Sequence, residues 1–399
     1  MRNSNKITGG ESVGYVVLGN STKPTPEKRA SREKVKISNV LRIPAECALE
    51  CGYEVFVGVN RDNPEQLEFD IPIKAYDANS YRSITAVKDN YQAYKNLCKL
   101  IREKNIQVIH CNTPIGGMVA RFAGKRCKVK KVIYTVHGFH FYKGASLFNR
   151  TVLKWSEKLM ARWTDAIITI NTEDYEVAKK MKLRRGGRVY YLPGVGVDTS
   201  DFAPNEIIRA EKRAELGFSP DDIVVISAGN LNANKNNRVI LSAMAHPDAK
   251  NVHYLVCGVG EKLDELKAQA QALGIADRVR FLGFRTDIKE LMQASDVFAM
   301  PSYREGLSRA MMEAMAAGLP CVASKIRGNT DLIDEGKGGF LCNPDDVEGF
   351  TKAITCLATD GELVRSMREY NLSKIHGYDT EIVREKLRAI YDELLDKKS

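Results

Sequence analysis

The segment DVFAMPSYREGLSRAMMEAMAAGLP (residues 296–320) joins a strand-like run, a turn and a helix-forming run. DVFAMPS is apolar and β-prone, whereas SRAMMEAMAA favours a helix that ends at Gly318 and Pro320. Glu305 lies just before this helix, and Glu313 lies inside it. A strand followed directly by a helix is the repeating unit of an α/β fold, so the segment predicts that fold class.

Short β-branched runs and longer helical runs alternate along the whole chain. Because such alternation is typical of parallel sheets covered by helices on both faces, we expect two doubly wound α/β domains. The predicted strands of the first domain are residues 13–20, 53–60, 107–112, 131–138, 166–171 and 188–194. Those of the second domain are residues 222–230, 251–258, 278–284, 296–302 and 320–325.

The stretch PGVGVDTSDFAPN (193–205) separates the two series of strands and indicates a linker, because it is rich in Gly, Pro and Asp. We therefore predict an N-terminal domain over residues 1–194 and a C-terminal domain over residues 195–378. The last segment, residues 379–399, is predicted to be an amphipathic helix that packs back toward the N-terminal domain. Its apolar stripe consists of Ile382, Val383, Leu387, Ile390 and Leu394.

The composition fits a globular protein of a reducing compartment. The chain has 399 residues, of which 44% are hydrophobic and 28% charged. It has no run of eighteen apolar residues, so no transmembrane helix is expected. Its start lacks the apolar core of a signal peptide, so export is not expected. Nine scattered cysteines argue against a disulfide framework, and we expect a cytoplasmic location.

Positive charge is concentrated in the first half of the chain. Residues 1–200 contain 34 Lys and Arg against 19 Asp and Glu, whereas residues 201–399 contain 26 against 31. The first half therefore carries a net +15 and the second half −5, which together give the net +10 of the chain. This asymmetry predicts an anionic partner for the first half: phosphates, an acidic membrane surface or nucleic acid.

The turn before the helix of the opening segment has the features of an anion site. Glu305 and Gly306 fall at the carboxyl end of a strand, where free backbone amides and the positive end of a helix favour negative charge. Glycine also lets the backbone approach a phosphate closely. Glu313 can lean back toward the helix start. An anion seat with two carboxylates suits a nucleotide sugar, whose diphosphate would bind the amides of Gly306, Leu307 and Ser308.

A purely structural interpretation fits the same residues equally well. Glu313 would then be a solvated helix residue that pairs with Arg309 four positions earlier, for roughly 0.3–0.5 kcal/mol or less. Glu305 would be an ordinary charge at a helix terminus. These residues alone leave both interpretations open.

Further motifs extend along nearly the whole chain from about residue 13. They are VIHCNTPIGGMVARFAGKR, YTVHGFHFYKGASLFNRTVLKWSEKLMARWTDAIITINTEDYEVAKK, LPGVGVD, AGNLNANKNN, FLGFRTDIKELMQASDVFAMPS and CVASKIRGNTDLIDEGKGGFLCN. With PSYREGLSRAMMEAMAAGLP, they resemble the family 4 glycosyltransferases of the GT-B fold, in their bacterial exopolysaccharide and capsule branch. The resemblance implies two Rossmann-like domains that face each other across a cleft, with the acceptor bound by the first and the nucleotide sugar by the second.

The resemblance also implies roles for single residues in binding the donor diphosphate. Lys235, in NANKNN, matches a lysine that clamps the diphosphate and stabilises the charge of the leaving group. Asn230 stands where most relatives have an arginine and some of this branch a glutamate. The second cation of the clamp is therefore in doubt, and Arg238 or Arg304 are candidates to replace it.

Three residues are implied to be catalytic: Glu305, Lys235 and His137, a histidine of the first domain that reaches the donor sugar and phosphate. Glu305 matches the carboxylate that contacts the sugar hydroxyls, and Glu313 matches the one that binds ribose. The remaining donor-binding residues implied are Asn230, Phe284, Arg285, Gly306, Leu307 and Ser308. The loop 19–34 matches an acceptor-facing region with Lys23, Lys28, Arg29 and Arg32, although an ordinary solvated loop fits it equally well.

We therefore expect a retaining, metal-independent hexosyl- or N-acetylhexosaminyltransferase that needs no cofactor. Its donor is expected to be a UDP-sugar, and its acceptor a lipid-diphosphate-linked glycan of exopolysaccharide or capsule synthesis. The basic first half predicts peripheral attachment to the anionic inner face of the cytoplasmic membrane. The alternatives are a UDP-sugar epimerase of the same fold and a non-catalytic nucleotide-sugar-binding partner subunit. A nucleic-acid binder is not favoured, since no base-stacking platform or recognition-helix motif is present.

Overall fold

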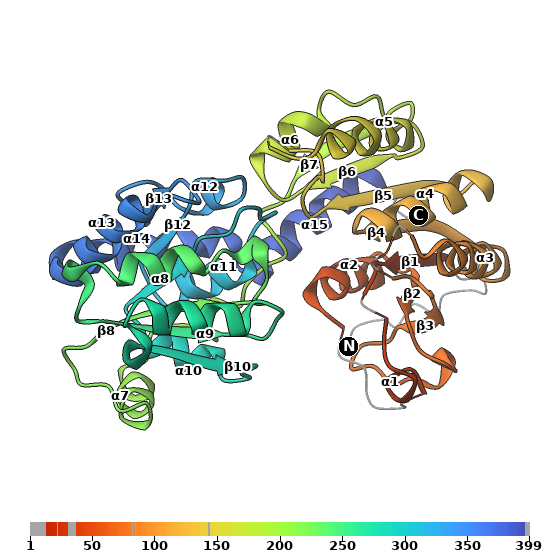
Figure 1. The fold of residues 1–399 in the computed structure, drawn as a ribbon. Coiled ribbons are helices and arrows are strands. Elements are labelled where there is room, and N and C mark those ends of the chain that lie inside the picture. Colours follow the sequence, from red (N-terminus) through yellow and green to blue (C-terminus); the bar gives the residue numbers. More distant parts are fainter. Residues whose placement is uncertain are drawn as a thin grey trace. The chain divides into compact units, whose positions relative to one another are not determined.

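The structure, a computed structural model, describes residues 13–21, 23–30, 37–81, 83, 85–142 and 144–395. The predicted α/β class is confirmed: the chain forms two parallel sheets, each with helices on both faces (Figure 1). Its contacts divide the chain into two compact units. Unit 1 comprises the described residues of Met1–Ile170, Asp174–Leu192 and Arg384–Ser399, and unit 2 comprises Asn171–Glu173 and Pro193–Val383.

Unit 1 is built on a seven-stranded sheet in the order β3-β2-β1-β4-β5-β6-β7, with every neighbouring pair parallel. The chain first builds outward from β1 to β3 and then restarts on the other side of β1 with β4. The strands are β1 (Gly14–Leu18), β2 (Glu54–Val59), β3 (Lys74–Asp77), β4 (Ile106–Asn112), β5 (Lys131–Val136), β6 (Ala166–Thr169) and β7 (Arg188–Tyr191).

Alternating side chains of these strands face two helical layers. Val16, Ile109 and Tyr134 belong to the core that α3 and α4 cover. On the opposite face, His110 Nδ1 lies 2.6 Å from the hydroxyl of Tyr391, which belongs to α15. The helices of the first half of the chain are α1 (Pro26–Ala30), α2 (Asn39–Glu50), α3 (Val87–Glu103), α4 (Pro114–Arg126), α5 (Lys154–Ala161) and α6 (Thr172–Ala178), with a π-helical turn, η2 (Asn149–Leu153), before α5.

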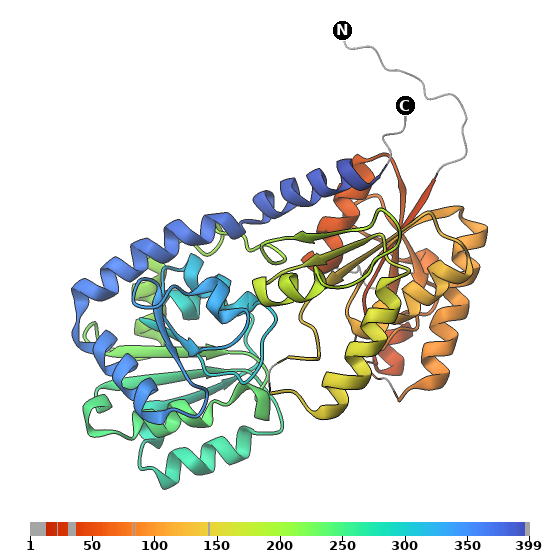
Figure 2. The same ribbon diagram turned by 90° about the horizontal axis from the view of Figure 1, so that it is seen from above.

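The final helix, α15 (Thr380–Leu394), begins in unit 2 and ends in unit 1. Its second part lies beside α2, where Arg384 and Arg388 both contact Glu50, at 2.8 and 3.3 Å (Figure 2). Four residues of the predicted apolar stripe are buried, but Ile382 is 36% exposed, so its assignment to that stripe was wrong. The helix period places Val383 and Leu387, and not Ile382, toward the interior.

Unit 2 is built on a six-stranded parallel sheet in the order β10-β9-β8-β11-β12-β13. Two apolar clusters, one on each face of the sheet, form its core. The strands are β8 (Ile223–Ala228), β9 (Val252–Cys257), β10 (Val279–Gly283), β11 (Val297–Met300), β12 (Cys321–Ser324) and β13 (Gly339–Cys342). The helices are α7 (Glu206–Glu215), α8 (Arg238–Met244), α9 (Leu263–Ala272), α10 (Ile288–Gln293), α11 (Arg309–Ala316), α12 (Asn329–Leu332), α13 (Val347–Thr359) and α14 (Gly361–Ile375).

Both sheets have a point at which the strand order reverses, between β1 and β4 in unit 1 and between β8 and β11 in unit 2. In open α/β sheets, ligands bind beyond the carboxyl ends of the strands at such a point. The loops after these four strands are therefore where each unit is expected to bind a ligand.

Candidate functional site

In unit 2, the loops after β8 and β11 bring two of the predicted catalytic residues together. Lys235 ends the short helical turn η3 (Ala233–Lys235), and its Nζ lies 2.8 Å from Glu305 Oε1. Their side chains are 23% and 15% exposed, so the ion pair is mostly shielded but reachable from solvent. A cation and a carboxylate thus lie side by side beyond the carboxyl ends of β8 and β11, where the strand order reverses.

Backbone hydrogen bonds hold these two loops to each other. The amide of Tyr303 donates to the carbonyl of Asn234 over 2.8 Å, and the Asn234 side chain donates to the carbonyl of Arg304 over 3.0 Å. The Asn232 side chain accepts from the amide of Lys235 over 3.1 Å and fixes the turn that presents the lysine. The position of Lys235 relative to Glu305 is therefore set by the main chain.

Two glycines after β9 let a third loop approach the loop after β8. A Cβ added to Gly258 would lie 1.8 Å from the carbonyl oxygen of Gly229, and one added to Gly260 would lie 2.2 Å from that of Leu231. Any side chain at these positions would push the backbone of the Lys235 loop away. Glycine is thus required here by close packing of main chains.

The start of α11 offers the anion seat that the sequence predicts. Ser308 is the N-cap, and its hydroxyl accepts a hydrogen bond from the amide of Met311 over 3.3 Å. Among the residues that the structure describes, none accepts a hydrogen bond from the backbone amides of Gly306 and Leu307. These amides, next to the positive end of a helix, are available to a phosphate.

Glu313 makes the ion pair that the structural interpretation anticipates. Arg309 Nε lies 2.8 Å from Glu313 Oε1, and the glutamate side chain is only 14% exposed. Burial raises the pKa of Glu313, and the neighbouring Arg309 opposes that rise. The contact of Glu313 with ribose remains a prediction, and ribose would have to bind a carboxylate that already pairs with Arg309.

The two residues expected near the base differ in their freedom. Phe284 follows β10 and is 77% exposed. Arg285, by contrast, makes two contacts with Asp287, of 2.7 and 2.5 Å. Hydrogen bonds from Arg285 hold the pKa of Asp287 well below its usual range. Arg285 is thus tied to the surface of unit 2, whereas the ring of Phe284 is available for contact with a planar ligand.

A cation that the sequence reasoning missed lies next to the anion seat. Arg327 follows β12, and its Nε lies 3.3 Å from the carbonyl oxygen of Glu305. A Cβ added to the next residue, Gly328, would lie 2.2 Å from the carbonyl oxygen of Gly306, so the two loops touch. The available signal was a basic residue two positions after the predicted strand 320–325, in the motif KIRGN.

Asn230, at the position where the family resemblance implies an arginine or a glutamate, is exposed in the loop after β8. Of the two residues considered as its replacement, Arg238 is engaged by Asp345 and by the Tyr303 hydroxyl, each at 2.8 Å. Arg304 is exposed.

In unit 1, a cavity of about 610 Å³ lies over the carboxyl ends of β4 and β5. It combines polar groups with a largely apolar wall from α4 and α5. The residues that line it are Asn20, Ser83, Thr113, Pro114, Ile115, Met118, Tyr134, His137, Gly138, Phe139, His140, Phe141, Leu153, Ser156, Glu157 and Met160. The first turn of α4 thus contributes the positive end of a thirteen-residue helix.

His137 lies in the wall of this cavity, with its Nε2 3.0 Å from Oδ1 of Asn112. Burial lowers the pKa of His137 to about 4, so its ring is neutral at pH 7 and acts through hydrogen bonds. The Asn112 side chain is buried, and its Nδ2 has no partner among the described residues. Sequence reasoning did not single out Asn112.

A buried ion pair supports the same cavity. Arg121 is fully buried on α4, and its Nη1 lies 2.8 Å from Oε2 of Glu157 on α5. The guanidinium carbon also lies 4.0 Å from the centre of the Tyr134 ring. Removing either charge would leave the other buried without a partner, at a cost of about 3–5 kcal/mol.

The basic residues expected at the acceptor have different surroundings. Arg29 is bound by Asp62 and Asp77, at 2.8 and 2.6 Å, and so is already neutralised. Lys23 lies 3.4 Å from Asp89, and Lys28 is exposed in the last turn of α1. The predicted Arg32 falls outside the described residues.

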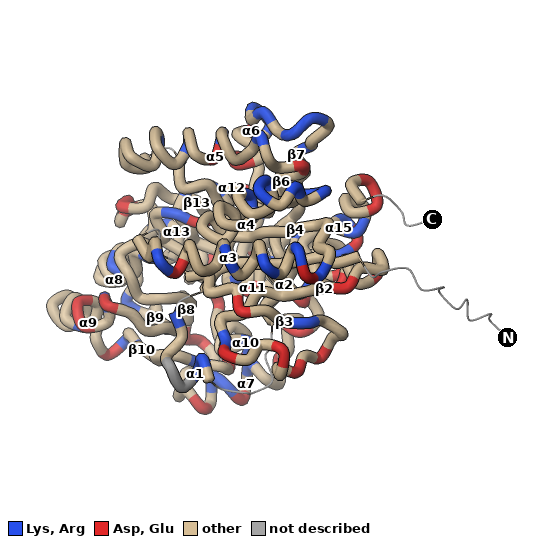
Figure 3. The backbone as a smooth tube through the Cα atoms, turned by 90° about the vertical axis from the view of Figure 1, so that its right-hand side faces the viewer, with Lys and Arg blue, Asp and Glu red and all other residues tan. Residues whose placement is uncertain are grey.

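A larger group of basic residues in unit 1 lies where α6 leads into β7 (Figure 3). It consists of Lys179, Lys180, Lys182, Arg184, Arg185 and Arg188.

Within the described part of the chain, no three His, Cys, Asp or Glu side chains are grouped to hold a metal ion. None of the described helices has the length and apolar character needed to span a bilayer.

Two family models match the chain, one in each half. The model described as glycosyl transferase 4-like matches residues 40–171, and the one described as glycosyl transferases group 1 matches residues 208–374. The sequence is 33% identical to the Bacillus subtilis (strain 168) protein EpsD, named as a glycosyltransferase, over 87% of this chain and 91% of that protein. It is 29% identical to the Escherichia coli UDP-Gal:alpha-D-GlcNAc-diphosphoundecaprenol alpha-1,3-galactosyltransferase, over 79% of this chain and 83% of that enzyme.

Solved structures share the fold at low sequence identity. Anabaena HepE in complex with UDP has a TM-score of 0.74 at 19% identity, over 96% of this chain and 100% of that chain. Sucrose-phosphate synthase from Thermosynechococcus elongatus has a TM-score of 0.77 at 18% identity, over 96% and 99% of the two chains. Sequence relatives, family models and fold agree, and the chain belongs to the family 4 glycosyltransferases of the GT-B fold.

Proposed function

We propose that the protein transfers a hexosyl or N-acetylhexosaminyl group from a UDP-sugar to a lipid-diphosphate-linked glycan, with retention of configuration. The observation that carries this proposal is the pair of Lys235 and Glu305 beside the amides of Gly306 and Leu307, for which the described residues offer no acceptor. A diphosphate needs cations and amide donors, whereas a sugar needs a carboxylate that accepts from its hydroxyls. Lys235 and the two amides supply the donors for the diphosphate, and Glu305, 2.8 Å from Lys235 Nζ, supplies the carboxylate for the sugar.

In the proposed reaction, the bond between the anomeric carbon and the diphosphate oxygen breaks, and a bond to the acceptor oxygen forms on the same face. The proton of the acceptor hydroxyl passes to the departing phosphate oxygen. Lys235 and the amides of α11 stabilise the charge that develops on that phosphate. Glu305 orients the donor sugar, and the neutral ring of His137 contributes a hydrogen bond to it.

Arg327 is proposed as the second cation of the diphosphate site. Its Nε contacts the carbonyl oxygen of Glu305, next to the amides of Gly306 and Leu307, whereas Asn230 has no charge and Arg238 is paired with Asp345. The reaction is proposed to need no metal and no cofactor, since protein cations and a helix end would balance the charge of the leaving group. Added EDTA should then leave the rate unchanged.

The acceptor is proposed to bind at the cavity of unit 1. Its polar groups, which include Asn20, Ser83 and Thr113, suit sugar hydroxyls, and its apolar wall suits the faces of sugar rings or a lipid. The galactosyltransferase relative, by its name, uses UDP-Gal and a diphosphoundecaprenol-linked GlcNAc. This supports the substrate classes proposed here, for exopolysaccharide or capsule synthesis at the inner face of the cytoplasmic membrane.

Thermal stabilisation of the purified protein by UDP, GDP and ADP, with EDTA present, tests the donor half of the proposal. A ligand at a hundredfold excess over its Kd adds about 2.7 kcal/mol to the folded state. A selective UDP shift supports a UDP-sugar donor, whereas a GDP preference redirects the search to GDP-sugars. No shift with any nucleotide contradicts the proposed donor site.

A non-catalytic nucleotide-sugar-binding subunit is the second candidate, because Asn230 is uncharged and exposed at the position where the resemblance implies an arginine or a glutamate. It would show the same UDP shift without transfer or hydrolysis of any UDP-sugar. A UDP-sugar epimerase would convert its substrate without an acceptor. Incubation of a panel of UDP-sugars with and without lipid-linked acceptor separates the three activities.

A further inference from the structure

One helical segment of unit 1 exposes a continuous row of large apolar side chains. The row, called here the apolar stripe, consists of Leu147, Phe148, Val152, Trp155 and Leu159 on η2, α5 and the residues just before them. Leu147 and Trp155 are 77% and 76% exposed, so most of their apolar surface is in contact with water. A row of this kind on one helix face indicates an unfilled contact.

The opposite face of the same segment belongs to the acceptor cavity. Leu153, Glu157 and Met160 line that cavity, and Glu157 is held there by the buried Arg121. The helix therefore separates the cavity from solvent: one of its faces lines the cavity, and the opposite face carries the apolar stripe. Whatever covers the stripe lies close to the bound acceptor.

Positive charge borders the stripe, and no exposed acidic group interrupts it. Arg150, Lys154, Lys158 and Arg162 are all exposed. The one acidic residue between residues 144 and 163 is Glu157, which is buried on the far side of the helix. Long basic side chains with apolar residues between them match a surface that is anionic outside and apolar beneath.

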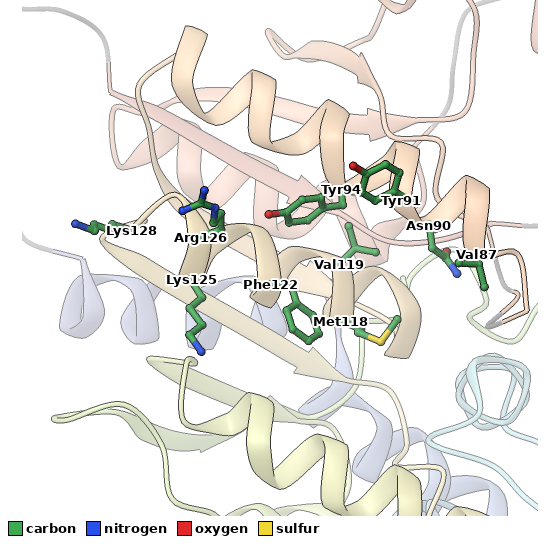
Figure 4. A pocket seen from close by; sticks show the side chains of 10 residues that line it. All are labelled: Val87, Asn90, Tyr91, Tyr94, Met118, Val119, Phe122, Lys125, Arg126 and Lys128. Carbon is green, nitrogen blue, oxygen red and sulfur yellow. The ribbon is translucent and has the colours of Figure 1, made fainter.

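The apolar surface continues from α5 to α4. The Trp163 ring lies 5.1 Å from that of Phe122, and Lys125 Nζ lies 3.9 Å from the centre of the Trp163 ring. Phe122 also lines a groove of about 660 Å³ between α3 and α4, shown in Figure 4. Of the residues in this groove, Met118 lines the acceptor cavity as well, so the two hollows are neighbours.

We propose that the apolar stripe inserts into the headgroup region of an anionic lipid bilayer and holds the acceptor cavity at the membrane surface. This deepens the proposed function, since it rests on an acceptor that is anchored in lipid. Charge alone would place the protein near the bilayer. The stripe adds an apolar contact that persists when salt screens the basic residues, because burial of apolar side chains does not depend on charge.

The two tryptophans of the chain allow a direct test. Trp163→Phe leaves Trp155, on the apolar stripe, as the only tryptophan. Its emission should shift to the blue with phosphatidylglycerol vesicles, and to a smaller extent with phosphatidylcholine vesicles, which offer the apolar contact without the attraction of charge. Lipids brominated along the acyl chain should quench the shifted emission. This measurement leaves the stripe itself unaltered, so it does not depend on whether a stripe variant folds.

A double variant, Phe148→Glu with Trp155→Glu, should lower vesicle binding by about tenfold or more, even in high salt. Ile207→Glu is the matched control, because Ile207 is equally exposed, at 72%, but lies on α7 of unit 2. The UDP-induced thermal shift, which reports unit 2, should be the same in all variants. The control should bind vesicles as the unaltered protein does.

Three results would overturn the proposal. Vesicle binding without a change in Trp155 emission would mean that charge alone makes the contact. Dimers that dissociate when Phe148 and Trp155 are replaced would assign the stripe to a second copy or another protein surface. Absence of vesicle binding together with a normal UDP shift would reject the membrane contact and leave the transferase proposal intact. If UDP causes no thermal shift in the unaltered protein, the proposed donor site is rejected instead.

Discussion

Lys235 and Glu305 are 70 residues apart in sequence, yet their charged groups lie 2.8 Å apart. Each follows a different strand of the same sheet, and the hydrogen bonds that join Asn234 to Tyr303 and Arg304 hold the two loops together. A diphosphate and the sugar attached to it would therefore meet a cation and a carboxylate at once. Mutations can therefore test the two residues separately, because Lys235 is proposed to bind the diphosphate and Glu305 the sugar.

Lys235→Ala should weaken UDP binding by about tenfold to a hundredfold, since a hydrogen bond to a charged group contributes roughly 1.5–3 kcal/mol. Isothermal titration with UDP measures the change. Lys352→Ala is the control, because Lys352 pairs with Glu348 at 2.6 Å on the exposed surface of unit 2. Unchanged UDP affinity in Lys235→Ala would remove the lysine from the diphosphate site.

Glu305→Gln should reduce sugar transfer by roughly a hundredfold or more, because the amide offers a donor where the sugar needs a charged acceptor. The change keeps the size of the side chain, so the melting temperature should remain close to that of the unaltered protein. UDP alone lacks the sugar, and its affinity should fall little. Transfer is measured with radiolabelled UDP-sugar, and full activity would place Glu305 outside the site.

Arg327→Ala should weaken UDP binding as Lys235→Ala does, if Arg327 supplies the second cation. Arg238→Ala is the matched control, because Arg238 is engaged by Asp345 and Tyr303. Both variants remove one guanidinium from unit 2. Equal affinities for UDP in Arg327→Ala and the control would contradict the role of Arg327, and a loss confined to Arg238→Ala would assign the second cation there.

Acid should destabilise unit 1 at mild pH. Burial lowers the pKa of His110 to about 3 and that of His137 to about 4, against about 6.5 in an unfolded chain. Between those values the unfolded chain binds more protons than the folded unit, so the free energy of unfolding falls as pH falls from about 6.5 to about 4. Both tryptophans, Trp155 and Trp163, lie in unit 1, so their emission follows its urea unfolding.

His137→Gln serves as the comparison for that experiment, since glutamine does not titrate. The variant should lose stability less steeply than the unaltered protein between pH 6.5 and about 4. Parallel pH profiles for the two proteins would show that His137 titrates alike in the folded and unfolded chain.

Tyr391→Phe should lower the free energy of unfolding of unit 1 by about 1–3 kcal/mol, because it removes a buried hydroxyl with two partners. That hydroxyl contacts both His110 and the Tyr15 hydroxyl. Urea unfolding followed by tryptophan emission measures the loss. Tyr91→Phe is a suitable control, because Tyr91 is 58% exposed on α3. An unchanged free energy would show that the network contributes nothing to the attachment of α15.

The sequence predicted the fold where apolar runs were long and clearly bounded. All eleven predicted strands are present, but β3 and β13 were missed. Both are four-residue strands at an edge of their sheet, and only Tyr76 of β3 and Gly339 and Cys342 of β13 are buried, so their pattern is hard to separate from a loop. Edge strands of this kind are defined by pairing with the sheet, which a local pattern does not report.

The candidate site was only partly predictable, for a related reason. The residues Lys235 and Glu305 could be selected because each sits in a recognisable motif, and the sheet order brings them together. Arg327 and Asn112 were missed, since their importance depends on a neighbour that is distant in sequence. Arg29 was selected for its charge, but only the folded structure shows that Asp62 and Asp77 already bind it.

The course of α15 has a consequence for how the protein is made. Unit 1 contains the first residues described and also the last ones, because Leu387 and Tyr391 of α15 fill its core. The ribosome makes α15 after every strand of unit 2, so of the two units the one begun first is completed last. Unit 2, by contrast, is complete at Val383, before Leu387 and Tyr391 are made. Nascent unit 1 must therefore wait for α15, which lies beside α2 and completes the helical layer on that face of its sheet.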